Sequence, residues 1–283
     1  MKYLILGAGG MAGHLIAYYL IEQGEEVEGL ARRNLPFCKT YNMDVTQFEN
    51  LKKLIDNNNY DIIINCIGML NQNADNNIDL AILVNSYLPH YLAKITKDMK
   101  TRIFQMSTDC VFSGKRGHYV EKDLPDGGSY YDRTKALGEL NDTKNLTFRN
   151  SIIGPDINEN GIGLFNWFMK QSGEINGYSK SIWTGVTTLT LAKAMHEASY
   201  QKITGVYNLV NNSKISKYDL LKLFNKYSNK GLTINKIDGI EQDKSLVRTR
   251  TDFSFIVPTY EDQVKDLFEW IKKHKILYKQ YNL

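Results

Sequence analysis

Short apolar segments alternate with longer amphipathic segments through the first half of the chain. Five short segments rich in apolar residues predict β-strands over Lys2–Leu6, Glu26–Ala31, Asp61–Cys66, Arg102–Ser107 and Leu146–Arg149. Between them, apolar residues recur at helical spacing and predict helices over Met11–Gln23, Phe48–Ile55, Leu80–Thr96 and Tyr130–Leu140. Because strands that are apolar on both faces alternate with helices, the pattern predicts an α/β fold with a doubly wound parallel sheet covered by helices.

The alternation becomes irregular and aromatic after about Pro155. Residues 1–155 are therefore predicted to form the sheet domain, and residues 156–283 mainly a smaller substrate-binding lobe with segments that return to the sheet. Within this second part, Glu261–Lys275 predicts an amphipathic helix with a solvated lysine face. The Asn-rich stretches Asn57–Asn59 and Asn71–Asn77 predict loops.

Composition narrows the class of protein. With 42% hydrophobic and 23% charged residues and a net charge of only +4, the chain has the make-up of a globular protein and too mild a basicity to predict nucleic-acid binding. No stretch approaches the roughly 18 apolar residues of a membrane span, so no membrane association is expected. Three cysteines without a CxxC spacing and five dispersed histidines predict neither a disulfide framework nor a metal site, and a cytoplasmic location is expected.

A glycine-rich turn joins the first predicted strand to the first predicted helix. Two spacings coexist there, Gly7-x-Gly9-x-x-Ala12 and the wider Gly7-x-x-Gly10-x-x-Gly13. Glycines at such a turn allow a tight bend, close approach of the backbone to a pyrophosphate, and close packing of helix on strand. The helix N-terminus, beginning at Met11, then offers free N–H groups and a positive dipole end to phosphates. The turn therefore predicts a dinucleotide site of the Rossmann type.

The end of the second predicted strand bears on the choice of dinucleotide. NAD enzymes commonly place an acidic residue there to accept from the ribose 2′-hydroxyl, whereas this chain has Ala31 followed by Arg32. An arginine suits the 2′-phosphate of NADP, so NADP(H) is favoured, with NAD(H) left open. Further along the chain, the segments predicted to border the adenosine are Asp44-Val45 and Cys66-Ile67-Gly68.

Catalytic candidates follow the fourth predicted strand. Tyr131 and Lys135 lie four residues apart, on one face of a predicted helix. A lysine ammonium near a phenol favours the phenolate and lowers the pKa of the tyrosine, and the lysine can also donate to the nicotinamide ribose. Ser107 and Thr108 end the preceding strand, where a hydroxyl could share a substrate carbonyl oxygen with the tyrosine.

These motifs together resemble the extended short-chain dehydrogenase/reductases. Within that group, the Ser-Thr-Asp-x-Val-Phe-x-Gly sequence at 107–114 is most similar to the dTDP-4-dehydrorhamnose reductase family. The resemblance implies transfer of hydride from NAD(P)H to C4 of a nucleotide-linked 4-keto-6-deoxy sugar, for synthesis of cell-surface polysaccharide precursors. It also implies that Thr108, Tyr131 and Lys135 are catalytic, and that Asn85 holds a water or a backbone contact.

Two departures qualify that resemblance. Family members commonly have tyrosine where this chain has Cys110, beside the sugar, so the identity of the sugar is open. Sugar-nucleotide dehydratases place an Asp-Glu pair after the threonine; here Asp109 is followed by Cys110, so dehydration is disfavoured. A sugar-nucleotide epimerase and a non-catalytic NADP-binding regulatory subunit remain alternatives, and a homodimer is one expected assembly.

The substrate pocket is the least defined part of the prediction. Asp109 and Cys110 are expected beside the sugar, and Trp183, Arg248 and Arg250 are candidates from the C-terminal half. The forked guanidinium groups of the two arginines suit a diphosphate, although a packed tryptophan and solvated arginines fit the sequence equally well.

Overall fold

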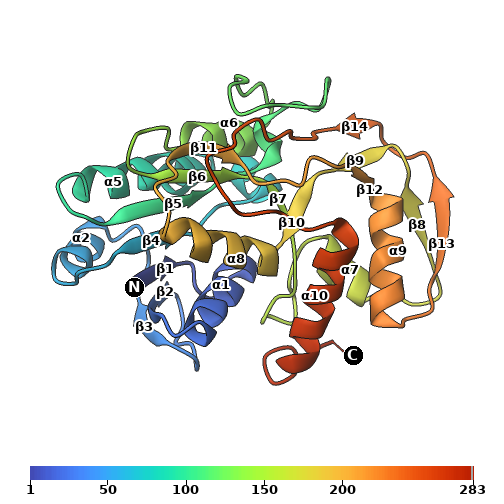
Figure 1. The fold of residues 1–283 in the computed structure, drawn as a ribbon, viewed down its shortest axis with the longest axis horizontal. Helices are drawn as coiled ribbons and strands as arrows, with labels where there is room; N and C mark the ends of the chain where they lie inside the picture. Colours follow the sequence, from blue (N-terminus) through green and yellow to red (C-terminus); the bar gives the residue numbers. More distant parts are fainter. Residues whose placement is uncertain (282) are drawn as a thin grey trace.

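The computed structural model describes residues 1–281 and 283. In this part of the chain, a central sheet of seven parallel strands has the order β11-β6-β5-β4-β1-β2-β3 (Figure 1). The strands are β1 (Lys2–Leu6), β2 (Glu26–Ala31), β3 (Lys39–Asn42), β4 (Ile62–Asn65), β5 (Arg102–Met106), β6 (Leu146–Arg149) and β11 (Gly205–Asn208). The predicted doubly wound sheet is thus confirmed, and β11 returns to it from the C-terminal half.

Helices cover both faces of the sheet because successive residues of each strand point to opposite sides. In β1, Tyr3 and Ile5 join the core under α1 (Met11–Glu22) and α8 (Thr188–Ser199). Leu4 and Leu6 join the core under α2 (Phe48–Asp56) and α5 (Leu88–Ile95). These four side chains are fully buried, which explains why β1 is apolar at every position after Lys2.

Two predicted elements differ in detail from the structure. The helix predicted over Leu80–Thr96 consists of α4 (Ile78–Ala81), a π-helical segment η1 (Ile82–Tyr87) and α5. The predicted loop Asn71–Asn77 is wrong, because α3 (Asn71–Asn76) forms there. This helix is held by tertiary contacts, since Ala74 is buried and the Asp75 carboxylate accepts from the Tyr130 N–H at 3.0 Å.

The C-terminal half adds a smaller lobe, at the right of Figure 1. Its elements are α7 (Leu164–Met169), β8 (Glu174–Tyr178), α9 (Lys217–Ser228), β13 (Thr233–Ile237) and α10 (Tyr260–Lys273). Short strands link the lobe to the sheet domain, namely β7 (Ser151–Ile153), β9 (Ser181–Trp183), β10 (Gly185–Thr187), β12 (Ile215–Ser216) and β14 (Gln242–Asp243). Aromatic packing explains the aromatic sequence of this half: Phe165 contacts Phe224, Phe268 and Tyr281.

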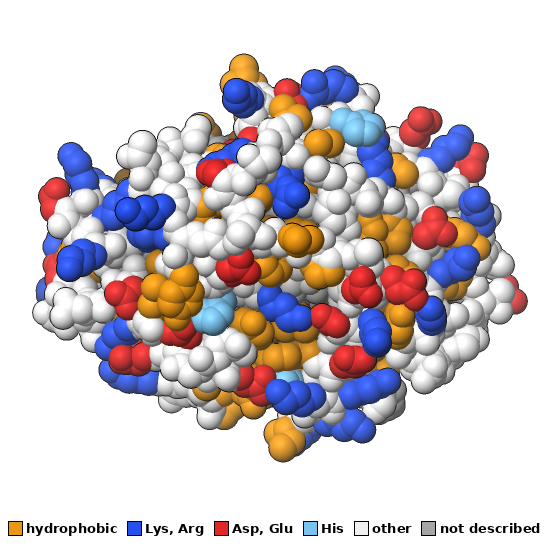
Figure 2. Space-filling view, in the orientation of Figure 1, with side chains coloured by type: hydrophobic (Ala, Val, Ile, Leu, Met, Phe, Trp, Pro, Cys, Tyr) orange, Lys and Arg blue, Asp and Glu red, His pale blue; other side chains and the backbone are white. Residues whose placement is uncertain are grey.

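The surface carries charges of both signs. On the face drawn in Figure 2, Lys and Arg side chains are interspersed with Asp and Glu rather than gathered into one block. Among the residues that the structure describes, no helix combines the length and hydropathy needed to cross a membrane.

Candidate active site

A cleft of about 750 Å³ opens at the carboxyl ends of β1, β2 and β4. The strand order reverses at this point of the sheet, with β1 lying between β4 and β2, and such switch points are where doubly wound sheets bind ligands. Most of the predicted cofactor-binding residues line this cleft: Gly7, Gly10, Arg32, Asp44, Val45, Cys66, Ile67 and Gly68.

The glycine turn has the geometry that a pyrophosphate site requires. Gly7 has a φ of +79°, and its N–H bonds to the Leu30 carbonyl at 2.9 Å. A Cβ on Gly13 would lie 2.2 Å from the Gly7 carbonyl oxygen, so only glycine allows α1 to pack this close to the turn. Gly10 caps α1 without a side-chain hydrogen bond, which leaves the first N–H groups of the helix, from Met11 onward, available to an anion. The turn therefore fits a dinucleotide pyrophosphate.

The rim of the cleft bears two arginines. Arg32 is exposed and forms no hydrogen bond or ion pair with another residue of the described chain, while its charge helps to lower the pKa of Asp44. The main cause of that lowering is Thr46, whose hydroxyl and N–H both donate to the Asp44 carboxylate. Arg33 also lines the cleft, but its guanidinium donates to Asn158.

The sequence prediction missed several residues of the cleft. Asn158 lines it from beyond the sheet domain, and its amide donates to the Gly9 carbonyl at 3.3 Å, so a C-terminal segment closes over the glycine turn. Asn73 and Asn77 line it from α3 and the residue after it. Only Arg33 had a sequence cue, its position beside Arg32; the asparagines reach the cleft through tertiary folding.

Thr108 and Tyr131 lie together beyond the end of β5. Thr108 caps the short helix η2 (Asp109–Val111): its hydroxyl accepts from the Cys110 N–H at 3.1 Å and donates to the Asp109 carboxylate at 3.1 Å. Tyr131, in α6 (Tyr130–Leu137), is only 8% exposed and packs beside Cys110. Burial raises the pKa of Tyr131, and a hydrogen bond with Thr108 opposes that rise. The sequence predicted that Lys135 would lower the pKa of Tyr131, whereas the main effect in the structure is the rise caused by burial.

Lys135 is buried one helical turn after Tyr131. Its ammonium donates to the Met106 carbonyl at 2.6 Å, and a Cβ on Gly68 would lie 3.9 Å from Nζ. Burial lowers the pKa of Lys135 to about 8, while the charge of Glu139 opposes the change. The ammonium therefore lies between the end of β5 and the rim of the cofactor cleft, and it titrates near neutral pH.

Ser107 and Asn85 have partners within the protein. The Ser107 hydroxyl donates to Glu139 at 2.6 Å, and Glu139 pairs in a forked arrangement with Arg149, which is 2% exposed. Ser107 thus belongs to a buried polar network beside Lys135, and its hydroxyl is directed to Glu139. Asn85, fully buried in η1, accepts from the Met69 N–H at 2.8 Å and donates to the Met69 carbonyl at 2.9 Å. It fixes the backbone next to Gly68.

Asp109 and Cys110 border the threonine–tyrosine pair. Burial raises the pKa of Asp109, and burial raises the pKa of the Cys110 thiol to about 11. Cys110 is therefore a neutral, partly buried thiol in contact with the tyrosine ring. In the described residues, no group of three or more His, Cys, Asp or Glu could hold a metal ion.

The predicted C-terminal substrate residues are not brought together with this group. Trp183 is buried against Tyr260, with ring centroids 5.6 Å apart. The Arg250 guanidinium donates to the carbonyls of Thr204 and Val206 and pairs with Asp252. Both side chains thus have partners within the fold, and their part in substrate binding stays a prediction. Arg248 donates weakly to the Phe255 carbonyl at 3.5 Å and lies near Tyr207.

A second cavity, of about 720 Å³, lies in the C-terminal lobe. It is lined by α7, β8, β13 and α9, with Trp167 and Tyr178 as its large aromatic residues and Lys217 as its cation. Leu164 lines this cavity and Ile162, two residues earlier, lines the cofactor cleft. The start of α7 thus lies between the two.

Comparisons with known proteins identify relatives over about half of the chain. A probable low-salt glycan biosynthesis reductase of Haloferax volcanii is 32% identical over 143 residues, which are 49% of this chain and 48% of the relative. A dTDP-4-dehydrorhamnose reductase of Aggregatibacter actinomycetemcomitans is 33% identical over 140 residues, 49% of this chain and 45% of the relative. The chain therefore spans about half the length of the curated relatives it matches.

The similarity in fold extends over nearly the whole chain. The crystal structure of a dTDP-4-dehydrorhamnose reductase from Bacillus anthracis, in complex with NADP, superposes with a TM-score of 0.81 at 19% identity and covers 95% of this chain and 100% of that chain. A UDP-glucose 4-epimerase from Thermotoga maritima superposes with a TM-score of 0.79 at 16% identity and covers 96% and 99%. A family model described as the RmlD substrate binding domain matches residues 1–256. This chain belongs to the RmlD substrate binding domain family.

Proposed function

We propose that this protein is an NADPH-dependent reductase of the C4 keto group of a nucleotide-linked 4-keto-6-deoxy sugar, for synthesis of glycan precursors. The observation that carries the proposal is the packing of Thr108, Tyr131 and Lys135 next to the glycine-lined cleft. Support also comes from the names of the relatives, several of which are dTDP-4-dehydrorhamnose reductases.

The cofactor cleft offers hydrogen-bond donors and a cation at positions that suit the phosphate groups of NADPH. Met11 and the residues after it at the start of α1 would hold the pyrophosphate, and Arg32 the 2′-phosphate. When bound, NADPH supplies the hydride. Lys135, whose ammonium faces the Gly68 side of the cleft, would hold the nicotinamide ribose.

The chain's own residues handle the proton and the developing charge. Tyr131 keeps its proton at neutral pH because burial raises its pKa, so it is poised as the acid that protonates the sugar oxygen. Thr108 would turn its hydroxyl from Asp109 to that oxygen as the substrate enters. Lys135 would stabilise the Tyr131 phenolate that remains. The negative charge that develops on the sugar oxygen would thus be met by two hydroxyl donors, Tyr131 and Thr108, with the Lys135 ammonium nearby.

The second cavity suits the nucleotide part of such a substrate. Trp167 and Tyr178 offer aromatic faces for a base, and Asn176, Asn235 and Lys217 offer polar contacts. The proposal keeps a cytoplasmic location, in accord with the free thiols of Cys38, Cys66 and Cys110.

The test is NADPH oxidation with dTDP- and UDP-linked 4-keto-6-deoxy sugars, followed by absorbance of the reduced nicotinamide. Net oxidation is expected with at least one of them. Tyr131→Phe should lower kcat by about a hundredfold or more, because it removes the proton donor. Tyr130→Phe is the matched control, since Tyr130 is 46% exposed, and it should leave kcat unchanged.

The other outcomes identify the alternatives. Retained cofactor without net turnover would indicate an epimerase, and the absence of oxidation with every sugar would indicate a binding subunit. Equal activity of Tyr131→Phe and the wild type would refute the assignment of the acid.

A further inference from the structure

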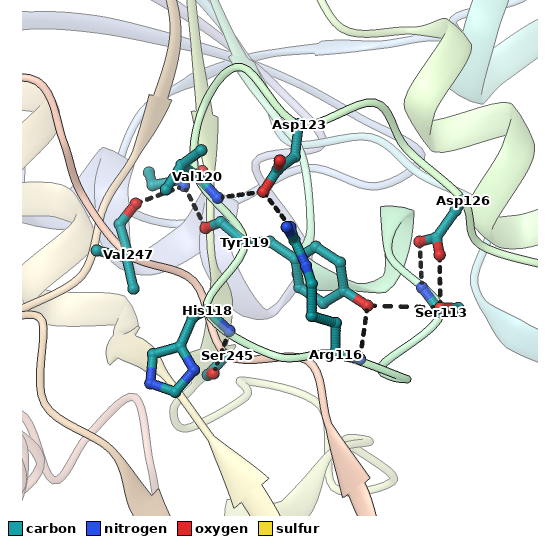
Figure 3. Close-up of polar contacts among 10 residues, drawn as sticks. Ser113, Arg116, His118, Tyr119, Val120, Asp123, Asp126, Ser245 and Val247 are labelled. Atoms are coloured by element: carbon teal, nitrogen blue, oxygen red, sulfur yellow. Dashed lines mark hydrogen bonds and ion pairs between the residues drawn. The ribbon is translucent and has the colours of Figure 1, made fainter.

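The segment before and after Lys244 is held firmly against the loop that follows η2. The Asp243 N–H donates to the Gly114 carbonyl at 3.2 Å, the Tyr119 N–H to the Ser245 carbonyl at 2.8 Å, and the Val247 N–H to the Tyr119 carbonyl at 2.8 Å. Figure 3 shows Ser245 beside His118, whose N–H donates to the Ser245 hydroxyl at 2.9 Å. Tyr119 and Leu246 are the paired residues of the bridge. Two distant parts of the sequence thus form one small parallel bridge.

The loop over residues 112–119, which contributes Tyr119 to this bridge, is held by contacts of its own. Phe112 and Tyr119 stack with centroids 4.1 Å apart, and the Arg149 and Arg116 guanidinium groups lie 4.9 and 4.8 Å from the Phe112 and Tyr119 rings. The Ser113 N–H and hydroxyl donate to Asp126, as drawn in Figure 3. The Lys244 backbone is therefore held through the bonds of its neighbours Asp243 and Ser245 to a loop that is itself well packed.

Lys244 has a packed stem and a free ammonium. A Cβ on Gly114 would lie 2.9 Å from Lys244 Cγ, so the glycine makes room for the lysine stem. The side chain is half-buried, and in the chain as described its ammonium forms no hydrogen bond or ion pair. The neighbouring Asp243 differs, because Lys214 pairs with it at 2.6 Å.

The charge of Lys244 acts on two residues of η2, Asp109 and Cys110. It lowers the pKa of Asp109 and of Cys110, against the larger opposite effect of burial on both groups. Its stem packs at Gly114, three residues after the end of η2, and its ammonium bonds to neither Asp109 nor Cys110. A cation without a protein partner among the described residues therefore lies against the loop that follows η2, and an anionic ligand would satisfy it.

We propose that Lys244 is a substrate-binding residue whose ammonium contacts a diphosphate oxygen of the sugar nucleotide. This inference rests on the proposed function, because it assumes that a nucleoside diphosphate sugar enters beside Thr108. Lys244 takes the role that the sequence had suggested for Arg250, whose guanidinium is occupied within the fold.

The experiment measures the binding of dTDP, UDP and thymidine to the whole protein in the presence of NADP, by isothermal titration. Lys244→Gln should raise the Kd of the bound nucleoside diphosphate by about tenfold or more, as expected for loss of a charged hydrogen bond, with the Kd of NADP and the thermal midpoint unchanged. Lys244→Arg should restore most of the affinity. Thymidine, which has no phosphate, should bind the Gln variant and the wild type equally.

Lys115→Gln is the matched control. It removes one positive charge from an exposed position of the neighbouring loop and should leave the Kd of the diphosphate unchanged. If the wild type binds dTDP or UDP and Lys244→Gln binds it equally well, the inference is wrong. If the wild type binds neither diphosphate, the substrate class of the proposed function is wrong instead.

Discussion

The cofactor cleft and the substrate side of the site were unequally predictable from the sequence. In the cleft, Gly7, Gly10 and Arg32, which the sequence singled out, line the cavity. On the substrate side, Trp183 and Arg250 serve the packing of the fold. The difference shows that a site formed by short segments, each directly following a predicted strand, is visible in the sequence. A site formed by segments that meet only after folding is not.

The largest expected effect concerns the cleft. Gly13→Ala would place a Cβ 2.2 Å from the Gly7 carbonyl oxygen, a backbone atom that cannot move without displacing the turn. We expect it to lower the free energy of unfolding by about 3 kcal/mol, the upper range for overpacking, measured by urea denaturation. Gly128→Ala is the control, because a Cβ there meets no atom within 4 Å. Equal stability of the two variants would contradict the tight packing of α1 on the turn.

The next prediction tests the substrate side. Arg250→Ala removes donors to the Thr204 and Val206 carbonyls and the pair with Asp252. The free energy of unfolding should fall by about 2 kcal/mol, since buried acceptors lose a charged donor, while KM for the sugar nucleotide stays unchanged. The reverse result, a higher KM at unaltered stability, would restore the original sequence prediction.

The secondary structure shows the same contrast between elements that a local sequence pattern predicts and elements that depend on tertiary contacts. β1 and β2 were predicted with their observed bounds because every residue after the first in each strand is buried in the sheet. α3 was missed because its polar sequence favours a loop, and its helix depends on Ala74 packing in the interior and on Asp75 binding the Tyr130 N–H. Local pattern suffices where burial follows the period of the element, and fails where a distant contact supplies the stability.

The catalytic group lies between these extremes. Tyr131 and Lys135 share one helix, as their four-residue spacing predicted, and their catalytic role is a proposal. Their electrostatics were not predictable, because the pKa of Tyr131 depends mainly on its burial. Lys244 had no motif at all: tertiary contacts bring it to the loop after η2, through the bonds of Tyr119 with Ser245 and Val247 and of Asp243 with Gly114.

A third prediction concerns the pH dependence of Lys135. Its folded pKa of about 8 is below the ordinary value because burial disfavours the charged form, so the ammonium is lost as the pH rises through 8. In the free enzyme, kcat/KM should then fall by about tenfold per pH unit above that value. Lys135→Arg, which stays charged, should retain a lower but flat profile over the same range. A wild-type profile that stays flat to pH 10 would contradict the role of the ammonium.

The smallest expected effect separates the two arginines at the rim of the cleft. Arg32 has no partner in the described chain, whereas the Arg33 guanidinium is held by Asn158, which also bonds to the Gly9 carbonyl. Arg32→Ala should therefore raise the Kd of NADPH by about fivefold, the loss of one exposed charged contact, and leave the Kd of NADH unchanged. Arg33→Ala should weaken both dinucleotides equally, because it loosens the segment that closes over the glycine turn and touches no 2′-phosphate. Fluorescence titration of the reduced cofactors measures all four constants. If only Arg33→Ala discriminated between NADPH and NADH, the 2′-phosphate would be bound by the arginine that the sequence did not single out, and even the better predicted half of the site would depend on tertiary contacts.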